Sequence, residues 1–216
     1  MSEQQAYDLY KLRTKEIFQN KKSIIEITKT WKYENYKDIL SLEDFKKAIR
    51  LKERRQGKRR RCYKKLIPIL NYYEEFKDLG INCNLVFGTC TFNDKELTRK
   101  EETRTKKVNK WIKEHFVIAL ANIDYGEKTE REHHHFIGIT FEDLKDTGRK
   151  GKKGYKLFNL ATPNNYDLGF APDLEKILLI EDERKLSNYL VKIQNHSNKT
   201  SAINRRIRLL RNLPIW

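Results

Sequence analysis

The stretch TEREHHHFIGIT, residues 129–140, decides how the middle of this chain folds and raises the question of what the chain does. Its second half is apolar and β-branched, which is typical of a strand, and three consecutive histidines precede it in a chain that holds only five. Successive side chains of a strand point to opposite faces. We therefore expect His133 and His135 to share one face and His134 to lie on the other.

The segment just before this stretch supplies a candidate third ligand for a metal ion. Two imidazoles one residue apart on a strand can bind one ion, because neutral histidine is a common metal ligand. The apolar segment VIALANID, residues 117–124, predicts a strand that pairs with 132–140 and brings Asp124 near His133. The alternatives for this ligand are the nearby acidic residues Glu127, Glu130 and Glu132.

A set of two histidines and one carboxylate has consequences for the ion and its role. It leaves coordination positions open on the metal, which suits catalysis better than a structural role. The carboxylate favours Mg²⁺ or Mn²⁺ over Zn²⁺. The competing interpretation is a polar strand end, in which the three histidines bind no metal.

The patterns around this hairpin predict further strands interspersed with helices. Strands are expected in the β-branched and aromatic segments 82–92, 155–161 and 174–180, with a Gly/Lys loop at 148–156. Helical spacing or capping residues mark the segments 41–55, 68–80, 103–116 and 181–195. There is no strict βαβ alternation and no phosphate-binding glycine motif, so the sequence favours an α+β domain.

The charge of the chain indicates a polyanionic partner. Lys and Arg outnumber Asp and Glu to give a net charge of +16, and nucleic acid is the first candidate partner. The densest basic run is KERRQGKRRRCYKK, residues 52–65. We expect this run and the basic tail to contact phosphates, through Arg54, Arg55, Arg59, Arg60, Arg61, Arg205 and Arg206.

The composition also indicates the cellular compartment in which we expect the protein. No apolar run approaches the ~20 residues that span a bilayer, so we expect no membrane association. The N-terminal residues lack the apolar region of a signal peptide. Cys62, Cys83 and Cys90 form no CxxC pair, so a reduced, cytoplasmic location fits best.

The predicted helix at 181–195 carries a possible nucleophile. Lys185, Tyr189 and Lys192 follow the spacing of one helical stripe. A phenol titrates near ~10, and neighbouring cations ease formation of the phenolate that attacks phosphorus. Taken alone, the stripe fits equally a half-buried tyrosine whose neighbouring lysines extend to solvent.

In this order the motifs resemble those of the HUH endonuclease superfamily, and most closely the rolling-circle replication initiators of small plasmids and single-stranded DNA phages or viruses. The resemblance covers about residues 82–196 and rests on the strand around VFGTCTF, the three histidines, and YLVK at 189–192. Ile193 follows the last motif, so the single-tyrosine class is implied. In the family the residue between the two ligand histidines is usually bulky and apolar, whereas here it is His134.

The resemblance implies a fold and an activity. The fold is a ferredoxin- or RRM-like antiparallel sheet with helices packed on it. The activity is nicking and joining of single-stranded DNA at a replication origin. His133, His135 and Asp124 would hold Mg²⁺ or Mn²⁺, and Tyr189 would form a 5′-phosphotyrosine that leaves a free 3′-OH. Lys192 would position the phosphate, and a helicase would be a separate host protein, because no ATPase motif follows.

We expect three parts and keep two other functions open. The parts are a basic, mostly helical extension at 1–65, an endonuclease domain at 66–200 and a basic tail at 201–216. One alternative is a non-enzymatic RRM-like nucleic-acid-binding protein, although no RNP-like aromatic pattern is evident. The other is a small HUH transposase, against which the long basic N-terminal region argues. The sequence does not predict the oligomeric state.

Overall fold

The computed structural model describes residues 1–19, 32–125, 131–151, 154–161, 168–177, 190 and 207–211. The chain divides into two compact units, Met1–Arg60 and Arg61–Trp216. Each unit has a hydrophobic core of its own. No helix in the described ranges is long and apolar enough to cross a membrane.

The first unit is helical and has an aromatic core. Its elements are α1 (Glu3–Gln19), η2 (Tyr33–Asn35) and the beginning of α3 (Leu42–Asp78). Tyr10 stacks on Tyr36 at 5.0 Å between ring centroids, and Phe45 packs against both rings. The predicted cap of α3 is present, because the backbone N–H of Asp44 donates to Ser41 Oγ at 3.1 Å.

Helix α3 differs from the sequence prediction of two helices with a basic arm between them. It is one helix of 37 residues that continues through the basic run and through Pro68. Proline and glycine inside a helix cost about 3 and about 1 kcal/mol relative to alanine. Burial of apolar residues near the end of the basic run and after it, namely Cys62, Leu66, Ile69 and Leu70, offsets that penalty.

The second unit is built on a seven-stranded sheet whose pairings are all antiparallel, so the fold class is α+β as predicted. The strand order is β4-β5-β6-β1-β3-β2-β7. Two helices join β1 to β2, namely α4 (Asp94–Leu97) and α5 (Glu101–His115). The strands are β1 (Asn84–Phe92), β2 (Ile118–Tyr125), β3 (Glu132–Thr140), β4 (Leu144–Lys150), β5 (Lys156–Leu160), β6 (Phe170–Lys176) and β7 (Arg208–Arg211).

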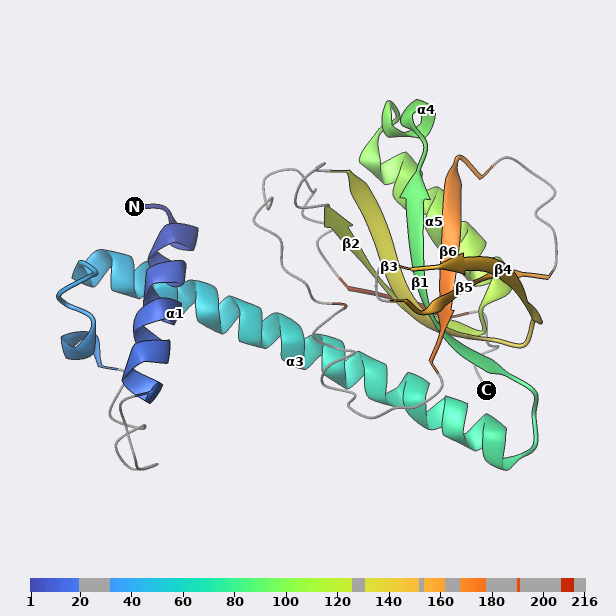
Figure 1. Ribbon diagram of the computed structural model, residues 1–216, viewed down its shortest axis with the longest axis horizontal. Helices are drawn as coiled ribbons and strands as arrows, with labels where there is room; N and C mark the ends of the chain where they lie inside the picture. The colour runs from blue at the N-terminus through green and yellow to red at the C-terminus, as the bar shows by residue number, and fades with distance from the viewer. Residues whose placement is uncertain are drawn as a thin grey trace. The chain divides into compact units, whose positions relative to one another are not determined.

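The two faces of this sheet are covered by different helices (Figure 1). On one face Trp111 and Ile112 of α5 pack against Phe136 of β3. On the other face Leu66 of α3 packs in a cluster with Ile137 of β3. We call these the α5 face and the α3 face. Adjacent residues of β3 therefore belong to different cores, as the strand period requires.

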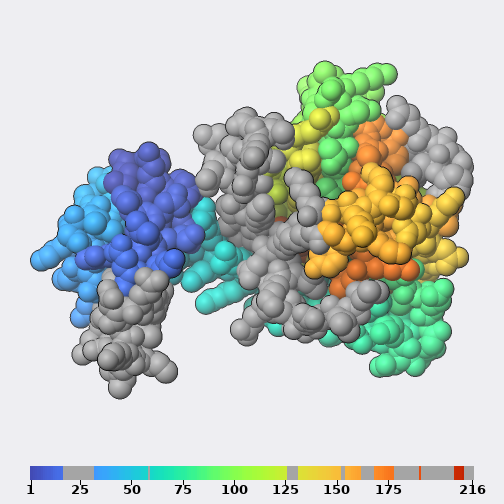
Figure 2. All heavy atoms as spheres, viewed as in Figure 1, coloured from blue at the N-terminus to red at the C-terminus, as the bar shows by residue number. Residues whose placement is uncertain are grey.

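The strands of the central hairpin were predicted within one residue, and the edge of the sheet was predicted less well. The expected loop at 148–156 is partly strand, because β4 extends to Lys150 past an irregularity in its pairing with β5. Gly148 lies there at φ +71°, a conformation that favours glycine. Most of β4 is exposed, and Figure 2 shows the atoms of β4 and β5, in yellow-orange, at the surface.

Candidate metal-binding face of the sheet

The three histidines of β3 lie on alternate faces, as the sequence predicted. His133 and His135 are partly exposed, and their rings are 6.2 Å apart between centroids. His134 has no exposed surface and its ring meets Phe92 edge-on in the α5 core. One strand thus carries two accessible imidazoles on its α3 face and one buried imidazole on the other.

Strand β1 provides a threonine opposite each accessible histidine. Thr89 is the register partner of His135, and Thr91 is that of His133. The Thr89 hydroxyl lies 3.0 Å from His135 Nδ1, and the Thr91 hydroxyl lies 3.1 Å from His133 Nδ1. These threonines were not singled out in the sequence, although their Thr-x-Thr spacing in GTCTF matches the His-x-His spacing across an antiparallel pair.

Asp124 lies where the hairpin prediction put it. It is the register partner of His133 in the β2–β3 pair. Its Oδ2 atom is 3.4 Å from Nε2 of His135, one step along the same face. Its Oδ1 atom is buried and has no hydrogen-bond partner among the described residues. A buried carboxylate oxygen without a partner is unfavourable, and a cation beside it would relieve that penalty.

Glu132, one of the alternative ligands, does not share this face. It is buried beside His134 on the α5 face, where Arg104 pairs with its carboxylate. Its Oε1 atom accepts a hydrogen bond from His134 Nε2 at 2.9 Å. Arg208 of β7, which is partly buried, donates to His134 Nδ1 at 3.2 Å, so Arg104, Glu132, His134 and Arg208 form one chain of polar side chains.

Burial shapes the protonation of this chain. Burial, together with the nearby Arg208, outweighs the hydrogen bond to Glu132 and lowers the pKa of His134 to about 4, so the ring is neutral at pH 7. Burial alone would raise the pKa of Glu132, but hydrogen bonds from His134 and Arg104 outweigh it and lower that pKa. Burial lowers the pKa of Arg208 to about 10, so its charge is kept. The network is therefore structural. The charged Glu132 pairs with Arg104 and accepts from the neutral His134, which in turn accepts from Arg208.

In the part of the chain that is described, the predicted metal ligands are two histidines and one carboxylate, and as they stand they do not form a group that could hold a metal ion. Within those ranges, no group of three or more His, Cys, Asp and Glu side chains is arranged to hold a metal ion. Glu127 and Glu130 lie outside the described residues. The donor types of His133, His135 and Asp124 fit a divalent ion, and the unpartnered Asp124 oxygen agrees with that fit.

Leu190 is the described residue closest in sequence to the predicted nucleophile. It is buried in the α3-face cluster with Ile137. Its carbonyl accepts a hydrogen bond from Asn122 Nδ2 at 2.6 Å, and Asn122 is the register partner of His135. The other predicted residues of this segment and of the tail lie outside the described residues, namely Tyr189, Lys185, Lys192, Arg205 and Arg206.

The predicted phosphate-binding arginines of α3 have different surroundings. Arg54 pairs with Glu3 of α1 within the first unit. Arg55 donates to Gln4 Oε1 at 2.7 Å and stacks over Tyr7. The side chains of the other three, Arg59, Arg60 and Arg61, are exposed. Arg54 and Arg55 thus hold α1 on α3, a role that the sequence did not reveal.

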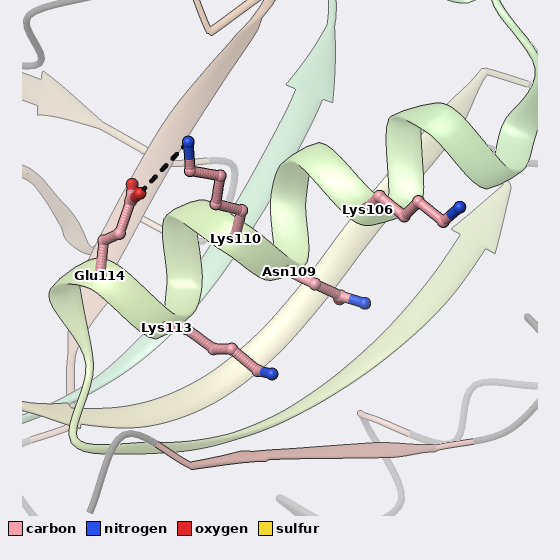
Figure 3. A pocket seen from close by; sticks show the side chains of 5 residues that line it. All are labelled: Lys106, Asn109, Lys110, Lys113 and Glu114. Atoms are coloured by element: carbon pink, nitrogen blue, oxygen red, sulfur yellow. Dashed lines mark ion pairs between the residues drawn. The ribbon is translucent and has the colours of Figure 1, made fainter.

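A hollow of about 540 Å³ lies away from the histidines, on the solvent side of α5. Figure 3 shows its lining side chains, Lys106, Asn109, Lys110, Lys113 and Glu114. Lys110 and Glu114 form an ion pair at 3.7 Å. The opposite side of α5 packs on the sheet face that holds His134, so this hollow is separate from the accessible histidines.

Comparison with protein-family models, with curated proteins and with solved structures gives no match.

Proposed function

We propose that this protein nicks and joins single-stranded DNA in the manner of an HUH endonuclease that initiates rolling-circle replication. In this proposal the sheet is the ferredoxin- or RRM-like sheet of that superfamily. His133, His135 and Asp124 hold a divalent ion, Mg²⁺ or Mn²⁺, and Tyr189 is the nucleophile. The exposed arginines of α3, with Lys185 and the basic tail, contact the DNA backbone.

One observation carries the proposal, namely the composition of the α3 face of β2 and β3. Two imidazoles and a carboxylate with an unpartnered oxygen lie on that one face, within a protein of net charge +16. Leu190, the residue after Tyr189 in the sequence, hydrogen-bonds to Asn122 on the same face. A nucleophile that acts beside a metal has to come from a segment that reaches this face, and the contact of Leu190 supports that role for its neighbour.

The chemistry assigned to the residues is a balanced transfer. The Tyr189 phenolate attacks phosphorus, the new phosphorus–oxygen bond forms as the bond to the 3′ oxygen breaks, and that oxygen takes up a proton. The 5′ phosphate stays on the tyrosine, so the reverse attack by a 3′-OH rejoins the strand without ATP. A bound divalent ion would polarise a non-bridging phosphate oxygen. Lys192 would orient the phosphate and stabilise the negative charge.

The proposal is tested with a pool of randomised single-stranded oligonucleotides that carry a 3′ fluorophore, incubated with the protein and Mn²⁺. The expected result is a labelled, SDS-resistant adduct, because the 3′ part of the cleaved strand remains on the tyrosine. Peptide mass spectrometry should place the DNA on Tyr189. The double variant His133→Ala, His135→Ala should form no adduct.

The matched variants are Tyr189→Phe and Tyr155→Phe. Tyr155 is 59% exposed and lies between β4 and β5, so its substitution should leave the adduct unchanged. Tyr189→Phe should abolish the adduct while DNA binding persists. An adduct that survives in Tyr189→Phe would move the nucleophile elsewhere. DNA binding without any adduct in the wild-type protein would favour the non-enzymatic alternative.

A further inference from the structure

Exposed hydrophobic side chains of the second unit lie together at the end of α3 and just after β3. Five large hydrophobic side chains of this unit are exposed within the described ranges, and four of them lie here, with Leu79 67% exposed and Phe141 47% exposed. Single exposed apolar residues are normal on a protein surface, whereas a contiguous group marks a binding surface. With the partly buried Phe76, the four form what we call the apolar patch: Tyr72, Phe76, Leu79, Ile81 and Phe141.

The patch is contiguous because a helical stripe meets the connection that follows β3. Tyr72, Phe76 and Leu79 have the spacing i, i+4 and i+7, which places them on one side of α3. The rings of Tyr72 and Phe76 stack at 6.4 Å between centroids. Phe141 meets the ring of Phe76 edge-on at 5.2 Å. Figure 2 shows the end of α3, in blue-green at the lower right, at the surface of the molecule.

The backbone that carries the patch is held in place in both segments. Gly80, at φ +69°, closes α3, and the N–H group of Ile81 donates to the Phe76 carbonyl at 2.8 Å. After β3, the side chain of Asn84 donates to the Glu142 carbonyl at 3.2 Å. A surface that is fixed before binding loses little conformational entropy when a partner docks, which favours binding.

The charges around the patch are opposite in sign to the charge of the whole protein. The segments 72–81 and 141–143 contain five acidic residues and one basic residue, although the chain has a net charge of +16. The basic residue, Lys77, lies over the ring of Tyr73, 5.5 Å from its centroid. Four of the five acidic side chains are exposed, namely Glu74, Glu75, Asp78 and Asp143. Carboxylates repel phosphates, so this surface disfavours nucleic acid and attracts lysine and arginine.

We propose that the apolar patch docks a protein partner whose contact segment presents bulky apolar side chains flanked by lysines or arginines. The apolar side chains of that segment cover the patch, and its cations face the exposed carboxylates. A second copy of this chain in a two-fold arrangement fits less well, because the acidic residues of the two copies face each other. The inference does not depend on the nicking activity.

The patch is separate from the basic surface assigned to DNA. At a rise of about 1.5 Å per residue, Phe76 lies about 22 Å along α3 from the exposed Arg61. The second unit can therefore bind a polyanion at the basic run and a basic protein segment at the patch at the same time.

The test selects random peptides displayed on phage against the immobilised protein, and removes those that bind equally well to the double variant Leu79→Ser, Phe141→Ser. The remaining peptides should combine bulky apolar residues with a net positive charge. Fluorescence anisotropy then gives the Kd of a labelled synthetic copy of one of them. The double variant should weaken this binding at least about 10-fold, because it removes the two most exposed side chains of the patch.

A second double variant, Glu75→Lys, Asp143→Lys, keeps the apolar side chains and reverses the charge beside them. It should also weaken peptide binding about 10-fold, since the peptide is basic. The matched controls are Tyr155→Ser, at the turn between β4 and β5, and Glu102→Lys, in the first turn of α5. Both should bind the peptide as the wild-type protein does, and thermal denaturation of every variant separates lost binding from lost folding.

Three results would overturn the inference. The first is a selection that gives acidic peptides, or none whose binding depends on Leu79 and Phe141. The second is a wild-type dimer in sedimentation velocity that becomes a monomer in Leu79→Ser, Phe141→Ser, because a second copy then occupies the patch. The third is loss of DNA binding in the same variant. Peptide binding is measured without DNA or metal, so its outcome is independent of whether a covalent DNA adduct forms.

Discussion

The two faces of strand β3 carry the same side chain in opposite environments. On the α3 face, His133 and His135 are partly exposed and each contacts a threonine hydroxyl. On the α5 face, His134 is completely buried between a carboxylate and an arginine. The residues are identical and adjacent, so the difference comes entirely from what packs on each side of the sheet.

This difference shows how position selects the chemistry of an imidazole. The buried ring has a pKa lowered to about 4 and both nitrogens hydrogen-bonded, so it holds the core together and binds nothing else. The partly exposed rings can meet a ligand, and a carboxylate lies beside one of them. The tripeptide His133–His135 thus contributes one residue to a structural cluster and two to a candidate metal site. The following experiments test whether the two faces of β3 have these different roles.

The largest effect on stability is expected on the α5 face, from Glu132→Ala. Removal of the carboxylate leaves Arg104 buried without its partner and takes the hydrogen-bond acceptor from His134. Loss of one partner of a buried ion pair destabilises by about 3–5 kcal/mol. Urea denaturation measures the change in the free energy of unfolding.

The control for this variant is Glu102→Ala, which removes the exposed surface pair with Lys106. It should change the free energy of unfolding by at most about 1 kcal/mol. An equally small effect of Glu132→Ala would mean that the buried chain on the α5 face does not stabilise the fold.

The second effect is a pH dependence of stability that belongs to His134. The pKa of the folded state, about 4, is lower than the ordinary value of about 6.5, so the unfolded state binds more protons between these values. The folded state, in which His134 is neutral, therefore has its full free energy of unfolding above pH 6.5. As the pH falls towards 4, that free energy decreases by up to about 3 kcal/mol.

Urea denaturation at pH 7 and at pH 4.5 measures this loss. His134→Gln removes the titrating group and keeps a donor and an acceptor for Glu132 and Arg208. The variant should therefore lose less stability between the two pH values than the wild-type protein. Equal losses in the two proteins would assign the pH dependence to other groups.

A third effect on stability is expected on the α3 face and depends on the proposed metal. Mn²⁺ at 100 times its dissociation constant should stabilise the folded protein by about 2.7 kcal/mol. His135→Ala should remove this increment, while His115→Ala should keep it, because His115 lies outside the α3 face and contacts Glu142. Thermal denaturation with and without Mn²⁺ gives the increment, and its persistence in His135→Ala would place the ion elsewhere.

The smallest effect is expected from the accessible histidines in the absence of metal. His133→Ala should change the free energy of unfolding by less than about 1 kcal/mol, because the ring is partly exposed. His134→Ala should cost about 2–3 kcal/mol, since it leaves buried polar groups without a partner. Similar values for the two variants would remove the distinction between the two faces.

Much of this arrangement could be predicted from the local pattern. The alternation of His133, His134 and His135 follows from the pleat of any strand, and the short connection between 117–124 and 132–140 favours a hairpin. The pairing of Asp124 with His133 follows from that hairpin. The helix of Trp111 and Ile112 was predicted from their spacing, and it begins at Glu101 and ends at His115.

Other features depend on partners far apart in the sequence. Thr89 meets His135 because β1 pairs with β3, across 46 positions of the chain. Arg208 reaches His134 across 74 positions, through an edge strand of four residues that no local pattern marked. The role of Glu132 was left open beside Asp124 because residue type alone does not tell a ligand from the partner of a buried arginine.

The sequence by itself therefore determined the periodic features: which side chains share a face, where the central hairpin forms, and that the chain is strongly basic. The tertiary structure alone decided which face is buried, that α3 continues through Pro68, and which neighbour each imidazole meets. The reason is physical. Periodicity is a property of the local backbone, whereas burial and hydrogen-bond partners depend on how separate strands and helices pack together.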